Sequence, residues 1–278
     1  MVSPANPPRY VPIDGKPWRL AMGLRTLTEE KWIEVDGLRE AELEQKRDLL
    51  RTARSTVVAT LPHSLAAQEE LEALVAKNLS EFHPRVIIDG FNDPEPIVRA
   101  SAVLQEDCCI LEHDGNGWLL TAACVCFPSR WTLTEKIGRD LTAIHAPVPS
   151  YATLLSAPVE GFFDRLKPDQ PKWRLNWTIL DTSELHLPTG SAHRRKELLD
   201  DLGDLTFRVE RQTLRRMENT GAVVFTIRNY TTPLSTLCRS QEVKDHLLAT
   251  LQTVNHEVAA YKGWEILLRP LTEWLSRE

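Results

Sequence analysis

The sequence predicts an α+β fold in which a five-stranded antiparallel sheet carries additional N- and C-terminal helices. Three observations lead to this prediction. Two apolar runs, 108–112 and 118–127, are joined by Asp-Gly-Asn-Gly, which favours a tight hairpin because Gly and Asn tolerate positive φ. Three further strand-like runs follow at 175–180, 205–217 and 222–230. Helical periodicity occurs on both sides of this region.

The remaining chain is predicted to be largely helical or irregular. Apolar residues recur at helical spacing in several segments, and prolines separate these segments from their neighbours. The helical candidates, in chain order, are 37–56, 64–82, 129–166, 240–262 and 264–276. Residues 1–30 are proline-rich and irregular, and the polar connector 183–203 is expected to hold a short helix.

Two strands, a helical stretch and then three strands is the order of elements in the PAS fold, so the sheet is predicted to be PAS-like. The run 118–127 is apolar on both faces, which an antiparallel sheet facing water on one side would not need. We therefore expect the N- and C-terminal helices to cover the face opposite the central helices. The predicted divisions of this one compact domain are 1–104 (arm and helices), 105–235 (PAS-like core) and 236–278 (C-terminal helices).

Composition excludes several classes of protein. A formal charge of −6 argues against a nucleic-acid partner, which would usually require a basic face. No run approaches the ~18 apolar residues of a membrane span, and no secretory signal is visible at the N-terminus. Five cysteines fit neither a disulfide framework nor a metal motif. We expect a cytoplasmic protein in a reducing compartment.

One of the eight histidines has an unusual setting. His145 closes a helical stretch that contains Ile137, Leu141 and Ile144, and the Pro-x-Pro at 147–149 prevents the helix from continuing. In a PAS-type layout, this places an imidazole at the end of a helix that faces the sheet. Taken alone, a histidine at such a position is more often structural than a metal ligand.

Several blocks of the sequence together resemble the haem-dependent oxidative N-demethylase family, which includes the haem subunit of a bacterial dimethylamine monooxygenase. The central block is Cys-Val-Cys-Phe-Pro-Ser-Arg-Trp at 124–131, with 135–139 and 144–149. A later block spans 209–214, 220–222 and 225–230. Shorter matches are Tyr10-x-Pro12, Met22-Gly23-Leu24, Trp32-Ile33-Glu34 and Lys46-Arg47. The resemblance therefore covers nearly the whole chain.

The resemblance implies a haem monooxygenase subunit that uses O2 to oxidise a small secondary amine such as dimethylamine and releases formaldehyde. It implies haem b with iron bound by His145, and electrons from separate reductase partners that carry flavin and an iron–sulfur centre. Consistent with outside electrons, the chain has no GxGxxG, P-loop or ferredoxin-type cysteine cluster. Two alternatives stay open: a haem-PAS sensor without turnover, and a family member that has lost haem.

Nearby side chains are candidates for binding the haem. Arg130, Lys136 and Arg139 lie within a few helical turns of His145 and could hold its propionates. Trp131 could pack against the porphyrin. The alternative for the cations is an ordinary solvated helix face, and for Trp131 an ordinary core position.

The hairpin between the last two strands determines the candidate catalytic residues. Residues 219–221 are predicted to form a three-residue loop with Gly221 at its left-handed position, which pairs Glu218 with Ala222. On that register, one face carries Glu210 opposite Tyr230 and Gln212 opposite Arg228.

Such a polar patch on an apolar sheet would suit a small polar substrate. The Glu210 carboxylate could hold an ammonium group, Arg228 could fix that carboxylate or orient bound oxygen, and Tyr230 could donate a hydrogen bond. The alternative is a cross-strand ion-pair network at the surface. A slip of one residue in the register would bring Arg211 to this face instead.

Overall fold

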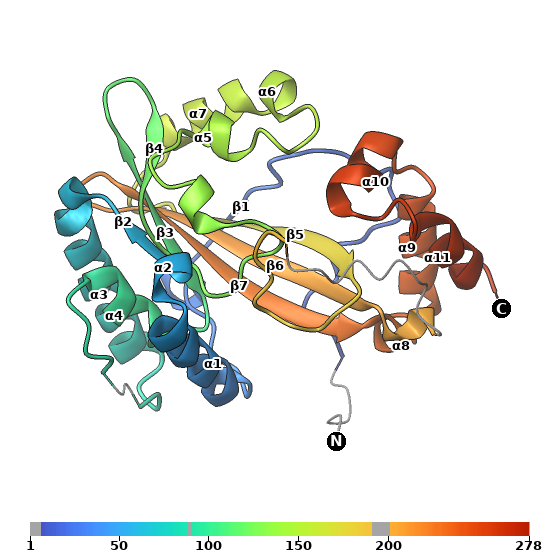
Figure 1. Cartoon of the computed structure of the whole chain (residues 1–278), viewed down its shortest axis with the longest axis horizontal. Helices are drawn as coiled ribbons and strands as arrows, with labels where there is room; N and C mark the ends of the chain where they lie inside the picture. The colour runs from blue at the N-terminus through green and yellow to red at the C-terminus, as the bar shows by residue number, and fades with distance from the viewer. Residues whose placement is uncertain (1–6, 88–89, 191–200, 278) are drawn as a thin grey trace.

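Seven antiparallel strands form one sheet in the order β1-β5-β6-β7-β3-β4-β2 (Figure 1). The computed structural model describes residues 7–87, 90–190 and 201–277. The strands are β1 (Arg25–Thr26), β2 (Val58–Thr60), β3 (Asp107–His113), β4 (Trp118–Cys124), β5 (Lys172–Leu180), β6 (Thr206–Arg216) and β7 (Val223–Pro233). The α+β class is confirmed, but the expected number of five strands is wrong. The additional β1 and β2 have two and three residues, too few to show a period in the sequence.

Eleven α-helices lie within the described ranges. They are α1 (Arg39–Thr52), α2 (Arg54–Val57), α3 (Leu65–Phe82), α4 (Pro96–Ser101), α5 (Leu141–Ile144), α6 (Tyr151–Leu154), α7 (Ser156–Arg165), α8 (Leu234–Leu237), α9 (Gln241–Leu251), α10 (His256–Lys262) and α11 (Leu268–Leu275). The predicted stretch 129–166 contains three short helices, because its prolines and the left-handed Ser150 (φ 61°) interrupt it. Residues 191–200 of the polar connector lie outside the described residues.

The β3–β4 hairpin has the predicted turn. Asp114 Oδ1 accepts the backbone N–H groups of Asn116 (2.7 Å) and Gly117 (3.0 Å), and Gly115 has a φ of 100°. A side-chain acceptor and a glycine with positive φ are what this turn requires.

The sheet is covered on both faces. Cys108, Ile110 and Val224 point to one face and pack in the same cluster as residues of α1, α3 and α4; we call this the N-terminal face. On the other face, Leu214 and Phe225 pack with residues of α5 and α7, and we call this the central face. The two-sided apolar pattern of the sequence therefore corresponds to helices on both faces.

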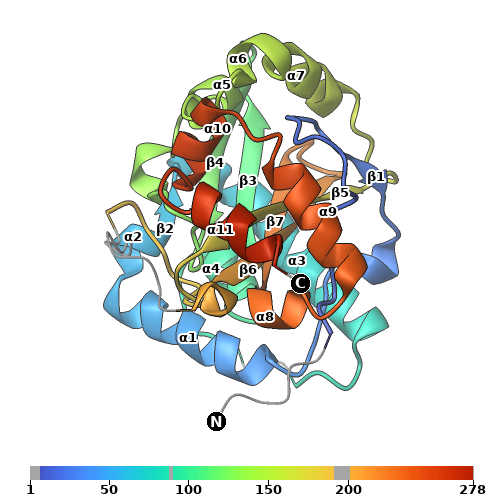
Figure 2. The same cartoon turned by 90° about the vertical axis from the view of Figure 1, so that its right-hand side faces the viewer.

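The C-terminal helices α8–α11 gather at one end of the long strands (Figures 1 and 2). They pack against Phe207 and Val209, which belong to the N-terminal face, and they also reach the edge of β5. There Trp264 Nε1 donates to Ile179 O (3.0 Å) and Lys262 Nζ donates to the Trp177 carbonyl (2.8 Å). These bonds cover carbonyl groups that an open sheet edge would expose. Within the described ranges, no helix is long and apolar enough to cross a membrane.

Candidate functional site

The β6–β7 hairpin has a longer loop than its sequence predicts. Met217 N–H donates to Ala222 O over 2.8 Å, so the four residues 218–221 form the loop. The Glu70 carboxylate on α3 accepts the N–H groups of two loop residues, each at 2.8 Å. The predicted three-residue loop is therefore wrong, and the pairing of the two strands shifts by one residue.

This shift divides the predicted catalytic patch between the two faces of the sheet. The observed pairs are Val209–Tyr230, Glu210–Asn229, Arg211–Arg228 and Gln212–Ile227. Since neighbouring residues of a strand point to opposite faces, Glu210 and Gln212 lie on the central face. Arg228 and Tyr230 lie on the N-terminal face together with Arg211. The expectation that all four share one face is corrected here.

Arg228 and Tyr230 bind acidic side chains of α1 and of the segment that leads into it. The fully buried Arg228 guanidinium lies 2.8 Å from both the Asp36 and the Glu42 carboxylates. The Tyr230 hydroxyl donates to Glu34, and burial together with that carboxylate raises the pKa of Tyr230. These contacts engage both side chains, although Arg228 Nε is buried without a hydrogen-bond partner among the described residues, and they hold Arg228 and Tyr230 against the N-terminal segment on the face away from Glu210.

Glu34 is the centre of a buried network that also fixes the N-terminal arm. Its carboxylate accepts hydrogen bonds from Arg9 (2.9 Å) and Tyr10 (2.6 Å) in addition to Tyr230. Arg211, 2% exposed, lies 3.5 Å from Glu34 and donates to backbone carbonyls of 31–32. This Glu34 network comprises Arg9, Tyr10, Glu34, Arg211 and Tyr230. It connects the arm to β6 and β7 through buried charges that are costly to leave unpaired.

On the central face, two amide side chains orient the Glu210 carboxylate. Glu210 Oε2 accepts hydrogen bonds from Asn176 Nδ2 on β5 (3.2 Å) and from Gln212 Nε2 (2.9 Å). Within the described chain, the other oxygen, Oε1, has no hydrogen-bond partner. All three residues are partly exposed, whereas Leu214 and Ile227 on the same face are buried. A carboxylate with one fixed and one open oxygen can accept a hydrogen bond from a ligand.

His145 ends α5 on the same side of the sheet. Asp140 caps this helix by accepting the Ala143 N–H (2.7 Å), and His145 Nδ1 lies 2.8 Å from Leu141 O. With the proton assigned to Nδ1, this bond leaves Nε2 as the free ring acceptor. Burial lowers the pKa of His145, so the imidazole is neutral at neutral pH. A neutral imidazole whose Nδ1 donates to a carbonyl is the arrangement that metal-ligating histidines adopt.

The four predicted haem-contact residues near His145 separate into two pairs. Lys136 Nζ donates to Ile144 O (2.6 Å) and lies 5.8 Å from the centroid of the Trp131 ring, so these two residues lie close to His145. The Arg130 guanidinium instead lies 3.3 Å from Asp181, and the Arg139 side chain is exposed. The structure therefore brings Lys136 and Trp131 together near His145, whereas Arg130 pairs with Asp181 and the side chain of Arg139 is exposed to solvent.

Sequence reasoning missed Arg174, which lies on the central face of β5 opposite Gln212. Its Nε atom is buried without a hydrogen-bond partner, and burial lowers the pKa of its guanidinium. A signal for it was present, since Lys172, Arg174, Asn176 and Thr178 alternate with Trp173, Leu175, Trp177 and Ile179. That period of two marks a strand that begins before residue 175, with one polar face.

Two further residues missed by sequence reasoning are Tyr151 and Lys262. The ring of Tyr151, at the start of α6, stacks on His145 with centroids 4.4 Å apart, and its hydroxyl is buried without a partner. Burial lowers the pKa of Lys262, on α10, to about 8, even though the Glu210 carboxylate opposes the shift. The positive charge of Arg174 lowers the pKa values of both His145 and Lys262. We call His145, Tyr151, Arg174, Glu210 and Lys262 the Arg174 cluster.

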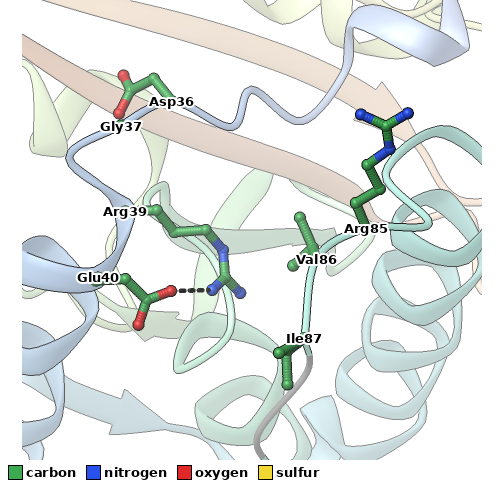
Figure 3. A pocket seen from close by; sticks show the side chains of 7 residues that line it. All are labelled: Asp36, Gly37, Arg39, Glu40, Arg85, Val86 and Ile87. Atoms are coloured by element: carbon green, nitrogen blue, oxygen red, sulfur yellow. Dashed lines mark hydrogen bonds and ion pairs between the residues drawn. The ribbon is translucent and has the colours of Figure 1, made fainter.

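A hollow of about 290 Å³ lies away from this cluster, at the start of α1 and the segment after α3 (Figure 3). Its lining includes Asp36, which is already bonded to Arg228, and the exposed Ile87. None of its lining residues belongs to the Arg174 cluster, so we assign it no role. Among the described residues, no three or more His, Cys, Asp or Glu side chains form a metal-binding group. Haem iron needs only one or two protein ligands.

The chain matches the model of one protein family over residues 23–87 and 87–271. That family is described as haem-dependent oxidative N-demethylase, alpha subunit-like. The chain belongs to this family. The family resemblance seen in the sequence is thus confirmed, and the family's name associates the fold with haem and with an assembly that has an alpha subunit.

Proposed function

We propose that this chain is the haem-binding subunit of a monooxygenase that oxidatively demethylates a small secondary amine such as dimethylamine and releases formaldehyde. The observation that carries the proposal is the setting of His145. Its Nδ1 is occupied by Leu141 O (2.8 Å), its imidazole is neutral, and Nε2 remains available. These are the requirements for an iron ligand in a family that is named for haem.

The residues around His145 fit a haem group. Trp131, Ile144 and Phe225 belong to the apolar cluster on the central face and are partly exposed, so they can contact a porphyrin. Tyr151 stacks on the His145 ring and holds its orientation. Haem b, when bound, would supply the oxygen and electron-transfer chemistry, and the protein would supply ligation, a shaped pocket and electrostatics.

Glu210 is the proposed binding residue for the amine. Asn176 and Gln212 hold one of its oxygens and leave the other to accept a hydrogen bond from an ammonium group. Such a charge-assisted bond is stronger than a neutral one and would fix the methyl-bearing nitrogen relative to the haem. Arg228 and Tyr230 are not included in this site, because they lie on the other face of the sheet.

The proposal includes a PAS-like core over 105–235 and separate reductase partners. In chain order, β3 and β4 precede α5–α7 and then β5, β6 and β7, and β3 pairs with β7, which supports a PAS-like arrangement. The family description names an alpha subunit, which supports partner chains. We expect these partners to carry flavin and an iron–sulfur centre and to act in the cytoplasm.

Optical spectra of the protein expressed with a haem supply would test the iron ligand. The wild type should show a Soret band, and His145→Ala should abolish or strongly shift it. His186→Ala is the matched control, because His186 Nδ1 also bonds a backbone carbonyl (Cys126 O, 2.7 Å). A Soret band that is unchanged by His145→Ala would remove His145 from this role.

Amine-induced difference spectra would test Glu210. Glu210→Gln preserves the shape of the side chain but deletes the charge, and a hydrogen bond to a charged group contributes roughly 1.5–3 kcal/mol. Amine affinity should therefore fall about tenfold or more while the Soret band stays unchanged. Equal affinity in the two proteins would remove Glu210 from amine binding.

A haem protein without turnover is the second candidate, and one observation favours it. Glu210 interacts electrostatically with three cations, Arg174, Arg208 and Lys262, so its charge is already partly compensated. If no amine perturbs the wild-type spectrum, the sensor function is the better explanation.

A further inference from the structure

The central face of the sheet holds more partly buried positive charge than its own acidic groups match. The buried arginines of the sheet bond through their terminal nitrogens, although Arg211 and Arg228 also have a buried Nε without a partner in the described ranges. Arg228 has two carboxylate partners, and Arg208 donates to Asn229 Oδ1 and to the carbonyls of Leu185 and Phe127. For Arg174, no hydrogen bond or ion pair is found among the described residues, although its Nε is buried. Arg174 is partly exposed as a residue, but its Nε donor is shielded from water and has no acceptor in the described chain, which is costly for a fold to retain.

Lys262 adds a second cation to the same place. Its ammonium donates to Trp177 O (2.8 Å) and lies 5.2 Å from the Trp264 ring centroid, but no carboxylate among the described residues lies within ion-pair distance. An ammonium has three donors, and in the described part of the chain this one has a single hydrogen-bond acceptor. Burial lowers its pKa to about 8, and Arg174 adds to the shift, so the two cations are close enough to repel each other.

Tyr151 contributes an unused neutral donor. Its hydroxyl is buried without a hydrogen-bond partner, and it interacts electrostatically with Arg174. Glu210 is the one carboxylate that acts on both cations, and Asn176 and Gln212 already bond one of its oxygens. Within the described residues, Tyr151 on α6, Arg174 on β5 and Lys262 on α10 therefore each have hydrogen-bond donors without an acceptor near one face of the sheet.

We propose that Arg174 and Lys262, with Tyr151 as a neighbouring donor, form a carboxylate-binding subsite whose ligand is a propionate of the porphyrin. The inference rests on the proposed function, and it replaces Arg130 and Arg139 as the residues that hold these groups. A guanidinium binds a carboxylate through two parallel hydrogen bonds, and an ammonium adds a point charge. Occupation of the subsite would also compensate the charges of Arg174 and Lys262, which leaves Arg208 as the remaining cationic neighbour of Glu210 and makes its carboxylate more available to an amine.

Metal-free protoporphyrin IX is the probe that separates this subsite from the iron ligand. Protein prepared without haem would be titrated with this porphyrin and with its dimethyl ester, and binding would be followed by porphyrin fluorescence. Wild type should bind the free acid at least about tenfold more tightly than the ester. Arg174→Gln and Lys262→Met should each remove most of that difference, and Arg174→Lys should restore part of it. Circular dichroism would verify folding of every variant.

Exposed cations provide the matched controls. Arg165→Gln and Lys167→Met change the same residue types near the end of α7 and should leave both affinities unchanged. His145→Ala should keep the preference for the acid over the ester, since no iron is present. The assay contains neither iron nor amine. A negative result therefore concerns carboxylate binding alone and not the roles proposed for His145 and Glu210.

Three results would overturn the proposal. Equal affinity of wild type for acid and ester would show that the porphyrin carboxylates are not recognised. An acid preference that persists in Arg174→Gln and in Lys262→Met would place the recognition elsewhere. Succinate, a small carboxylate, distinguishes a porphyrin propionate from a free carboxylate as the ligand, and its binding would be measured by thermal shift. If it stabilises the wild type but not Arg174→Gln while porphyrin binding is unaltered, the ligand is a free carboxylate and the assignment to propionate is wrong.

Discussion

Replacing Lys262 with methionine should raise the free energy of unfolding of the ligand-free protein at neutral pH, and this gain in stability should shrink as the pH rises. Burial lowers the pKa of Lys262 from 10.5 to about 8. Each pKa unit corresponds to about 1.4 kcal/mol, so the charged ammonium costs the folded state about 3 kcal/mol at pH 7. Methionine has a similar length and no charge. It loses the bond to Trp177 O, which offsets about 1 kcal/mol or more of the gain.

The sign of the pH dependence follows from proton binding. Because the folded pKa lies below the unfolded value, the unfolded chain binds more protons between about pH 8 and pH 10.5. The free energy of unfolding of the wild type should therefore rise with pH across this window relative to that of Lys262→Met. Between pH 7 and pH 9, the difference between the two proteins should narrow by about 1 kcal/mol, or roughly 2–4 °C in Tm.

Chemical denaturation of both proteins at pH 7, 8 and 9 would measure this difference, with Lys46→Met as the contrasting control. Burial opposes the charge of Lys46, but Asp107 outweighs it and raises the pKa of Lys46. The stability that Lys46 contributes is therefore fully present below pH 10.5 and is lost only above it. Lys46→Met should destabilise the protein by a similar amount at all three pH values. A constant difference between wild type and Lys262→Met would refute the reasoning about Lys262.

Three other substitutions test the structural assignments. Tyr230→Phe removes a hydrogen bond to the buried Glu34 and should lower the free energy of unfolding by about 1–3 kcal/mol in a denaturant titration, with the Soret band of the haem-loaded protein unchanged; a shifted band would return Tyr230 to the haem pocket. Arg228→Met leaves the Asp36 carboxylate without its cation and should cost about 3–5 kcal/mol, measured in the same way; a loss below 1 kcal/mol would contradict its structural role. Leu71→Ala empties a fully buried position on α3 and should cost about 2–5 kcal/mol in thermal unfolding, with porphyrin binding intact.

Local signals predicted the elements well, while the register of the last hairpin depended on a distant residue. The turn at 114–117 is specified by its own Asp, Asn and Gly residues, and it forms as predicted. In the 218–221 loop, the backbone N–H groups bind Glu70, which precedes them by about 150 residues. The sequence near the loop contains no sign of that contact, so a three-residue and a four-residue loop could not be distinguished.

The candidate site was also predictable only where local sequence signals specify it. The proline residues after His145 fixed its place at a helix end, which a local reading can find. The predicted placement of Glu210 and Arg228 on one face depended on the register of the hairpin. Because that register is shifted by one residue, the two side chains lie on opposite faces. Arg174 was visible as a member of an alternating strand, but its closeness to His145 and Lys262 follows only from how the sheet and helices pack.

The Glu34 network has a consequence for the order in which the chain folds. The β6–β7 hairpin closes across four residues, whereas the bond between Tyr230 and Glu34 spans 196 residues. Loop-closure entropy makes the longer span cost about 3 kcal/mol more. Docking of the segment that carries Glu34, and of the arm that Arg9 and Tyr10 attach to it, should therefore follow hairpin formation, after most of the folding barrier has been crossed. Loss of the Glu34 carboxylate would then accelerate unfolding far more than it slows folding, so the arm sets how long the native protein survives.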